Sequence, residues 1–251
     1  MDFDVLLDYY KKNQKITLLK HFNELKSSTT DFNFYHTTSA IHSSNIEGNF
    51  LDYDSFYKQK IMGKNFQGKS FNEIDDLINA YSYAKNNTIT YANVLKAHEI
   101  STNTIIENTN YKGKIRDVEV YVVKNSEIIY TGCPLLELSS ELTLFFTTIE
   151  KLKNKQTNYP ETFYYAAMIH LIFVHIHPFA DGNGRMARLL EKWFLAEKLN
   201  ENAWKIPSEK LYHKRIKQYY STLNIGNTYQ TTNYNASYPF LKMLPMALRI
   251  Q

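Results

Sequence analysis

The chain of 251 residues is 43% hydrophobic and 22% charged, which is enough to bury the core of one large domain. Its net charge of +4, with lysines spread along the chain and not gathered in runs, gives nucleic-acid binding little support. The single cysteine, Cys133, excludes an intramolecular disulfide, and the opening residues lack the basic region and apolar run of a signal peptide, so we expect a cytoplasmic protein.

Helix should dominate, because only 8 glycines and 6 prolines interrupt the chain and apolar residues recur at spacings of three and four. This pattern predicts a mostly α fold class. The predicted helices cover residues 3–27, 35–46, 52–62, 70–86, 91–106, 134–154, 161–176, 184–198 and 208–225. The stretch 161–176 is the most apolar, but it contains His170 and His175, so we expect a buried helix and no membrane span.

A short β-hairpin is predicted for residues 118–130. Alternating valines lead into Lys124-Asn125-Ser126, and a second apolar run follows this turn. A small hairpin is marginal alone, so it must lean on the helices. Residues 228–237 are rich in Thr, Asn and Tyr and should form a loop.

The most informative segment is residues 177–188, which read His-Pro-Phe-Ala-Asp-Gly-Asn-Gly-Arg-Met-Ala-Arg. One predicted helix stops before Pro178 and the next begins at Gly184, so the segment is a loop that leads into a helix N-terminus. Such a terminus offers unpaired backbone N–H groups, and Gly182 and Gly184 allow the close backbone approach that a phosphate needs. The segment therefore resembles an anion-binding loop.

The charged side chains of this segment favour a polyphosphate. Arg185 and Arg188 are three residues apart on one helical face, so both guanidinium groups can reach successive phosphates. Asp181 supplies a hard oxygen ligand suited to Mg²⁺. His177 titrates near neutrality and can accept a proton from an attacking hydroxyl.

Simpler explanations exist for each residue alone. A loop with Asp-Gly-Asn-Gly is usually just a turn, and a histidine beside proline is more often a packing residue. A zinc cluster of His170, His175 and His177 matches no closed-site spacing, so we expect His170 and His175 to pack in the core. The combination of residues in the loop nevertheless favours a nucleotide site.

The segment resembles the motif of the Fic family, His-x-Phe-x-Asp/Glu-Gly-Asn-Gly-Arg-x-x-Arg, at every specified position. The resemblance implies a Fic-fold helical domain that transfers AMP from ATP to Ser, Thr or Tyr hydroxyls of a target protein. It also implies that Phe179 is a buried anchor of the loop. The implied roles are the general base for His177, the Mg²⁺ ligand for Asp181, and phosphate binding for Gly182, Asn183, Gly184, Arg185 and Arg188.

A second resemblance lies upstream, where Ser43-Ser44-Asn45-Ile46-Glu47-Gly48-Asn49 is similar to the inhibitory motif of the family, marked by Ser43 and Glu47. It implies that Glu47 pairs with Arg188 and keeps the γ-phosphate of ATP from docking. The alternative is an ordinary helix end with a solvated glutamate. Related enzymes use the same glutamate to help remove AMP, so a de-modifying activity stays open.

Two further regions match the family loosely. The hairpin resembles its flap, which binds an extended target segment by strand addition and borders the nucleotide through Val120, Tyr121, Val122 and Val123. A purely structural edge hairpin is the alternative. Downstream, Tyr219, Tyr220 and Asn227 correspond to positions that contact the purine.

The sequence thus predicts an N-terminal helical extension over residues 1–36, a Fic domain over 37–228 with its inhibitory helix at 37–47, and a tail over 229–251 packed on the domain. The predicted activity is protein adenylylation with ATP and Mg²⁺, without nucleic-acid or membrane partners. Nothing in the sequence excludes a homodimer. The alternatives are transfer of another nucleotide or phosphate moiety by the same loop, and a catalytically idle binding module that retains the fold.

Overall fold

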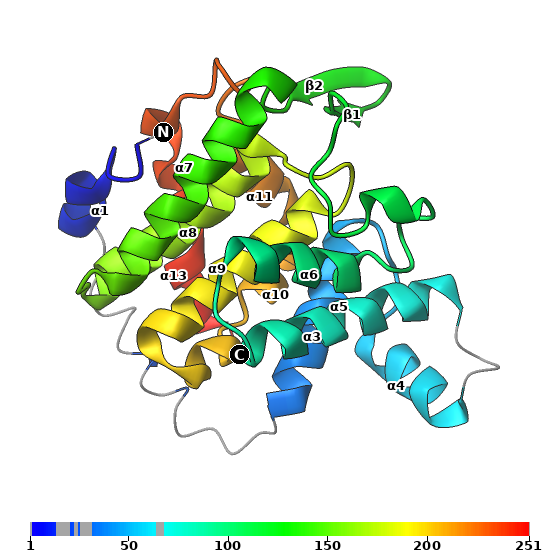
Figure 1. The fold of residues 1–251 in the computed structure, drawn as a ribbon. Coiled ribbons are helices and arrows are strands. Elements are labelled where there is room, and N and C mark those ends of the chain that lie inside the picture. Colours follow the sequence, from blue (N-terminus) through cyan, green and yellow to red (C-terminus); the bar gives the residue numbers. More distant parts are fainter. Residues whose placement is uncertain (1, 14–20, 23–24, 26–31, 64–67, 251) are drawn as a thin grey trace.

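The computed structural model describes residues 2–13, 21–22, 25, 32–63 and 68–250, and it is mostly helical with one antiparallel hairpin (Figure 1). Its α-helices are α1 (Leu7–Asn13), α3 (Phe32–Ile46), α4 (Tyr53–Met62), α5 (Lys69–Lys85), α6 (Tyr91–Ser101), α7 (Leu135–Asn154), α8 (Tyr159–Ile176), α9 (Asn183–Leu199), α10 (Ser208–Lys214), α11 (Ile216–Leu223), α12 (Tyr238–Leu241) and α13 (Met243–Met246). The 3₁₀ segments are η2 (Thr109–Tyr111), η3 (Glu201–Lys205), η4 (Tyr234–Ala236) and η5 (Ala247–Arg249). The strands are β1 (Tyr121–Lys124) and β2 (Glu127–Thr131). The predicted fold class is confirmed.

Helix α8 runs through the centre of the molecule beside α9 (Figure 1). It begins with a capping box, in which the Asn158 side chain accepts from the Glu161 N–H at 3.0 Å and the Glu161 carboxylate accepts from the Asn158 N–H at 3.0 Å. Every residue from Thr162 to Phe173 is buried, as expected for a helix that is apolar on all sides. The prediction of a buried helix here is confirmed. Neither α8 nor any other helix within the described ranges combines the length and apolarity needed to cross a membrane.

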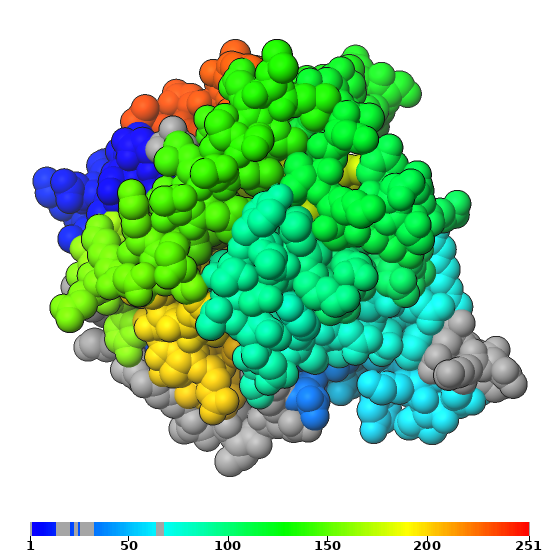
Figure 2. Space-filling model, in the orientation of Figure 1, coloured from blue at the N-terminus to red at the C-terminus, as the bar shows by residue number. Residues whose placement is uncertain are grey.

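The other helices enclose this central pair. Helix α7 packs along α8, α5 packs against α3 and α6, and α10 packs against α3. From the side shown in Figure 2, α9 reaches the surface mainly near its C-terminal end, where the colour is yellow. In the first turns of α9, which follow the loop with the nucleotide motif, Asn183 and every residue from Arg185 to Leu195 are buried.

Polar contacts join α3 to α9. The ammonium group of Lys192 donates to Ser39 Oγ at 2.6 Å, and Nε of Arg188 donates to Ser43 Oγ at 2.8 Å. The members of each helix are four residues apart, so they lie on one face of that helix, and their order shows that the two helices run antiparallel. We call these two pairs the polar ladder. It fixes the register of the helices so that the C-terminal end of α3 lies beside the N-terminal end of α9.

The predicted hairpin is present and is held to the body of the protein. Its turn residues Asn125 and Ser126 have positive φ values of 50° and 65°, the conformation that tight hairpin turns require. At the other end of the hairpin, the Thr131 N–H donates to the Asn227 carbonyl at 3.0 Å and the Tyr229 N–H donates to the Thr131 carbonyl at 3.0 Å. The hairpin therefore leans on the segment that follows α11.

The single helix predicted for residues 208–225 is wrong, because α10 and α11 divide at Arg215. This residue has φ −116° and ψ 38°, outside the helical range. Its N–H still donates to the Leu211 carbonyl at 2.9 Å, and its carbonyl accepts from Tyr219 N–H at 2.8 Å. The break is thus a bend in a nearly continuous backbone ladder.

Three other predicted boundaries change. Helix α6 ends at Ser101 and not at residue 106, because the hydroxyls of Ser101 and Thr102 bond back to the His98 carbonyl at 3.1 and 2.7 Å and compete with helix continuation. The helix predicted for residues 3–27 begins at Leu7, and its residues 14–20, 23–24 and 26–27 lie outside the described residues. The loop predicted for residues 228–237 contains the 3₁₀ turn η4.

Burial of α8 gives a stability prediction. Leu171 is fully buried, whereas Leu136 on α7 is 99% exposed. Leu171→Ala should lower the free energy of unfolding by about 2–5 kcal/mol because it leaves a cavity in the core. Leu136→Ala, which removes the same atoms from the surface, should change it by less than about 0.5 kcal/mol. Urea denaturation followed by circular dichroism measures both, and equal effects would contradict the central placement of α8.

Candidate functional site

The loop between α8 and α9 is closed by the side chain of Asn183. Its Nδ2 donates to the Phe179 carbonyl at 2.8 Å, and its Oδ1 accepts from the Phe179 N–H at 2.9 Å. The residue is buried, and both ends of its amide are used within the loop. What Asn183 can still offer a ligand is its backbone N–H in the first turn of α9.

The loop is also stacked against α6. The Phe179 ring lies on the imidazole of His98, with centroids 3.6 Å apart and planes 6° apart. Nδ1 of His98 accepts from the Gly113 N–H at 3.0 Å, so Nε2 carries the hydrogen and donates to the Asp181 carbonyl at 2.9 Å. Burial lowers the pKa of His98 to about 4, which keeps the ring neutral in this arrangement. Phe179 is buried, as the resemblance implied, but the role of His98 has no signal in the sequence.

His177 has one ring nitrogen free to act as a base. It caps α8 in the left-handed conformation, with φ 54°, and its Nδ1–H donates to the Val174 carbonyl at 3.0 Å. The neutral ring therefore carries its lone pair on Nε2. Burial lowers the pKa of His177, so this neutral form predominates at neutral pH.

Arg116 holds His177 and the base of the hairpin together. The buried guanidinium donates from Nε to the His177 carbonyl and from Nη1 to the Val118 carbonyl, both at 2.8 Å, and from Nη2 to the Cys133 carbonyl. Its backbone N–H also donates to the Pro178 carbonyl at 3.0 Å. These contacts join segments that are far apart in the sequence, which is why sequence patterns did not identify Arg116.

Arg188 is buried and contacts two other helices. Nη2 donates to the Ser43 carbonyl at 3.0 Å and to Glu47 Oε1 at 2.7 Å, in addition to the Nε contact of the polar ladder. Nη1 donates to the Tyr219 hydroxyl at 3.3 Å. Although burial alone would lower it, the neighbouring Tyr219 and Glu47 raise the pKa of Arg188 above its ordinary value. The contact expected between Glu47 and Arg188 is therefore present.

The Glu47 carboxylate lies directly in front of the first turn of α9. A methyl group on the Gly184 Cα would collide with Glu47 Oε1 and would lie 3.2 Å from Nη1 of Arg188. The arginines Arg188 and Arg185 outweigh the effect of burial and lower the pKa of Glu47, so the group is a carboxylate at neutral pH. An anion thus already lies where the helix N-terminus and the arginine favour one.

Beside this carboxylate is a hollow of about 370 Å³, lined by Glu47, Gly48, Asn49, Lys69, Ser70, Glu73, Ile105, Asp181 and Arg185. Arg185 pairs loosely with Glu73, with Nη2 and Oε2 3.6 Å apart, and its buried Nε has no hydrogen-bond partner in the part of the chain that the structure describes. A buried N–H without a hydrogen-bond partner lowers the stability of the folded protein, so a ligand with an acceptor atom would be stabilised here. Asp181 is exposed, and its Oδ1 accepts from the Gly182 N–H at 2.6 Å while Oδ2 faces no protein donor within the described residues. Such a free hard oxygen beside a polyphosphate fits Mg²⁺.

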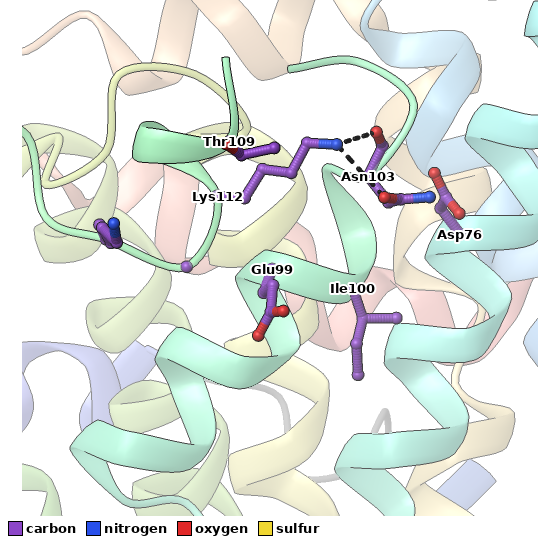
Figure 3. Close-up of a pocket in the computed structure, with 8 residues that line it drawn as sticks. Asp76, Glu99, Ile100, Asn103, Thr109 and Lys112 are labelled. Atoms are coloured by element: carbon purple, nitrogen blue, oxygen red, sulfur yellow. Dashed lines mark hydrogen bonds between the residues drawn. The ribbon is translucent and has the colours of Figure 1, made fainter. Parts of the chain in front are cut away.

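A larger hollow of about 680 Å³ lies behind the loop, between α5, α6 and η2, and contains no residue of the motif. Figure 3 shows Lys112 reaching across it, where its ammonium group donates to the backbone carbonyl of Asn103 at 2.6 Å and to Oδ1 of the same residue at 3.2 Å. Gly113 lines this hollow and also donates to His98. One side of this hollow therefore supports the His98 ring on which Phe179 of the loop stacks.

The two tyrosines expected to contact the purine separate. Tyr219 is 1% exposed, and its hydroxyl contacts His170 Nε2 at 2.9 Å as well as Arg188. Its ring faces the core, because neighbouring helix positions point about 100° apart, and its contact with the purine stays a prediction. Tyr220 is 46% exposed and donates to the Ile46 carbonyl at 3.0 Å.

The remaining expected residues lie around the hairpin. Asn227 is exposed, and its carbonyl holds Thr131. Val120 precedes β1, and both its Cγ2 and the Cβ of His177 lie close to Gly132, at 3.0 and 3.1 Å from where a Cβ would stand. The end of the hairpin near Gly132 thus lies beside His177, the candidate general base. Of the hairpin's other expected residues, the exposed ones are Tyr121 and Val123 and the half-buried one is Val122.

His170 and His175 lie in the core, as expected. Nδ1 of His170 faces Glu191 Oε2 at 2.8 Å, and the two nitrogens of His175 face the carbonyls of Leu171 and Leu223 at 2.8 and 3.0 Å. Both histidines are buried. They have no ring nitrogen left for a substrate.

Sequence comparison identifies the domain that contains the site. Residues 88–195 match the Fic/DOC family. The protein adenylyltransferase Fic of Aedes aegypti is 30% identical over 159 residues, and that of Culex quinquefasciatus is 29% identical over 159 residues. In both cases the match covers 59% of this chain and 30% of the relative. The chain thus spans less than a third of the length of these relatives.

Solved structures share the fold. A Fic family protein from Desulfovibrio desulfuricans G20 superposes with a TM-score of 0.72 at 22% identity, covering 93% of this chain and 71% of that one. Fic-1 from C. elegans gives 0.69 at 17% identity, covering 92% and 67%. A Fic domain containing signaling protein from Bacteroides thetaiotaomicron gives 0.63 at 18% identity, covering 98% and 92%.

The buried state of His98 predicts a pH dependence of stability. Its folded-state pKa is about 4, whereas a histidine in an unfolded chain titrates near ~6.5. The unfolded chain therefore binds the proton first, so this stability is present above pH ~6.5 and is lost as the pH falls toward ~4. In His98→Gln, the unfolding free energy should decline less steeply in this window, by about one proton per chain. Urea titrations across the window measure the slope, and an unchanged slope would exclude His98 as a source.

Proposed function

From the Fic domain that this chain contains, we propose that it transfers AMP from ATP to a hydroxyl group of a target protein. The observation that carries the proposal is the Nε2 of His177, which has no partner among the described residues and lies next to a helix N-terminus with two buried arginines. The relatives named protein adenylyltransferase support the reaction type. A kinase that transfers the γ-phosphate of ATP would need the same hydrogen-bond donors. An experiment must therefore show whether AMP or the γ-phosphate is transferred.

The proposed step is an in-line displacement at the α-phosphorus. The target oxygen attacks phosphorus, His177 Nε2 takes the hydroxyl proton, and the bond to the bridging oxygen of pyrophosphate breaks. The guanidinium groups of Arg185 and Arg188, with the N–H groups at the start of α9, stabilise the charge on the phosphate oxygens. Asp181 would hold Mg²⁺, which when bound neutralises part of the phosphate charge.

We further propose that Glu47 inhibits this reaction. Its carboxylate lies against Gly184 and pairs with Arg188 at 2.7 Å, where the terminal phosphates of ATP would lie. Two anions cannot share this space, because steric overlap and like-charge repulsion both oppose it. The resting protein should therefore be weakly active until the C-terminal end of α3 moves.

The hairpin is the proposed docking site of the target. Thr131 at the end of β2 is bridged to Thr228, which covers part of the outer edge of β2, whereas the outer edge of β1 has no strand partner among the described residues. An extended target segment can add there by main-chain hydrogen bonds. The exposed side chains of Tyr121 and Val123 would contact it.

A labelling assay tests activity and inhibition together. With α-labelled ATP and Mg²⁺, Glu47→Gly should label itself or a lysate protein at least about tenfold more than the wild type. Removing the partly exposed carboxylate frees the buried guanidinium of Arg188 for a phosphate. His177→Ala in the same background should give no label. Glu107→Gly, an exposed loop glutamate far from Arg188 in the sequence, is the matched control and should behave as the wild type.

The outcomes separate the alternatives. Equal labelling of the wild type and Glu47→Gly would remove the inhibitory role of Glu47. Label that is transferred only from γ-labelled ATP would identify a kinase. No label from any of the four nucleoside triphosphates would favour a binding module that retains the fold.

The metal role of Asp181 can be tested with a neutral substitution. Asp181→Asn keeps the acceptor for the Gly182 N–H but removes the charge that would hold Mg²⁺. In the Glu47→Gly background it should lower the labelling rate by roughly 10- to 100-fold and raise the Mg²⁺ concentration needed for half-maximal rate. An unchanged Mg²⁺ dependence would exclude Asp181 as the ligand.

A further inference from the structure

A chain of buried polar groups continues behind Arg188 into the core. The Tyr219 hydroxyl, 3.3 Å from Nη1 of Arg188, lies 2.9 Å from His170 Nε2. His170 Nδ1 lies 2.8 Å from Glu191 Oε2, and the Tyr212 hydroxyl donates to both Glu191 oxygens at 3.0 and 2.9 Å. All of these groups are 1% exposed or less. We call Tyr219, His170 and Glu191 the relay.

The hydrogen-bond directions in the relay follow from its two ends. The Glu191 carboxylate can only accept, so Nδ1 of His170 carries a hydrogen and donates to it. At the other end Arg188 can only donate, so the Tyr219 hydroxyl, which burial keeps a phenol by raising its pKa, gives its hydrogen to Nε2 of His170. The Tyr219 oxygen therefore turns its lone pair toward Arg188. Each bond polarises the next, so the negative charge of Glu191 is felt at that oxygen.

The relay lies on other helices than the remaining partners of Arg188. Ser43 and Glu47 both lie at the end of α3, the segment that must move if Glu47 is to leave. Tyr219 lies on α11 and is anchored through α8 and α9. Of the contacts that Arg188 makes in this structure, the one to Tyr219 is thus independent of α3.

We propose that the relay is a positioning device that keeps the Arg188 guanidinium aimed at the terminal phosphates of the nucleotide when α3 releases it. The proposal rests on the function proposed above, since it assigns Arg188 to those phosphates. A buried cation that loses a carboxylate partner would otherwise turn toward solvent or toward another acceptor. Glu191, three residues after Arg188 on α9, is such an acceptor, but its oxygens already accept from His170 and Tyr212. Its charge reaches Arg188 through His170 and Tyr219.

A purely structural role for these groups is the competing explanation. Buried polar networks often hold helices together without any link to ligands, and removing one partner then costs stability alone. The two explanations differ in what happens to nucleotide selectivity. A misplaced Arg188 weakens binding of ligands that carry β- and γ-phosphates, whereas a loosened core weakens binding of AMP and ATP alike.

The test compares Glu47→Gly with Glu47→Gly/Tyr219→Phe, which retains the ring and removes only the hydroxyl. Isothermal titration calorimetry in the presence of Mg²⁺ gives dissociation constants for ATP and for AMP. We expect ATP binding to weaken roughly tenfold, as for loss of one hydrogen bond to a charged group, and AMP binding to stay within about twofold. Glu191→Gln in the same background, which keeps an acceptor for His170 but removes the charge, should shift the ratio in the same direction by less.

Tyr165→Phe is the matched control. The Tyr165 hydroxyl accepts from Lys155 at 2.7 Å and donates to Asp4 at 2.6 Å, so it links a cation to a carboxylate as Tyr219 does, but between α8 and the N-terminal segment. It should leave both dissociation constants unchanged. Equal losses for ATP and AMP in Tyr219→Phe, an unchanged ATP constant, or the same selective loss in Tyr165→Phe would each overturn the relay while leaving the proposed function in place. If Glu47→Gly itself binds neither nucleotide, the proposed function fails and the relay fails with it.

Discussion

The guanidinium of Arg188 is a cation buried in the protein, and much of the architecture can be understood as the surroundings that such a group requires. An ionised group without water must find acceptors for its N–H groups, and Arg188 cannot lose its proton. Ser43 and Glu47 supply acceptors from the end of α3, and Tyr219 supplies one from α11. The positions of both helices against α9 are therefore tied to one side chain. The pair formed by Ser39 and Lys192 repeats the arrangement one turn further along.

The need of buried polar groups for hydrogen-bond partners also explains why the histidines differ in whether a ring nitrogen can accept a proton. His98 and His170 each use both ring nitrogens, one as donor and one as acceptor. His177 lies in the left-handed turn at the end of α8 and, among the described residues, hydrogen-bonds through Nδ1 alone. Chemistry at this site therefore depends less on the presence of an imidazole than on which nitrogen the fold leaves unpaired.

The sequence was sufficient for the parts of the structure that depend on local pattern. The loop after His177 that leads into α9, the buried helix before it and the hairpin turn at Asn125 all follow from spacing and residue type. Contacts between distant segments could not be predicted in this way. Arg116 reaches His177 across 61 residues, and His98 reaches Asp181 across 83. Neither belongs to a recognisable motif, because a guanidinium bonded to carbonyls leaves no characteristic pattern in the chain.

The tyrosine pair illustrates a second limit. A resemblance assigns Tyr219 and Tyr220 together, but consecutive helix residues point in different directions, and only packing decides which of them faces the core. The bend at Arg215 adds to this uncertainty, since it resets the phase of the apolar pattern between α10 and α11. Sequence could place the pair near the site but could not separate the support of Arg188 from the residue with an exposed ring.

The missing side chain at Gly184 affects which substitutions the site can accept. The absence of a side chain there leaves room that the Glu47 carboxylate fills, and a phosphate approaching the start of α9 would need the same room. A larger residue at this position would displace the Glu47 carboxylate and would narrow the same space for a phosphate. Under the function proposed above, substitutions that relieve inhibition and keep activity should lie in α3 and its C-terminal turn, whereas substitutions at position 184 should lower activity. The missing side chain at Gly184 thus determines which substitutions affect inhibition alone and which affect activity as well.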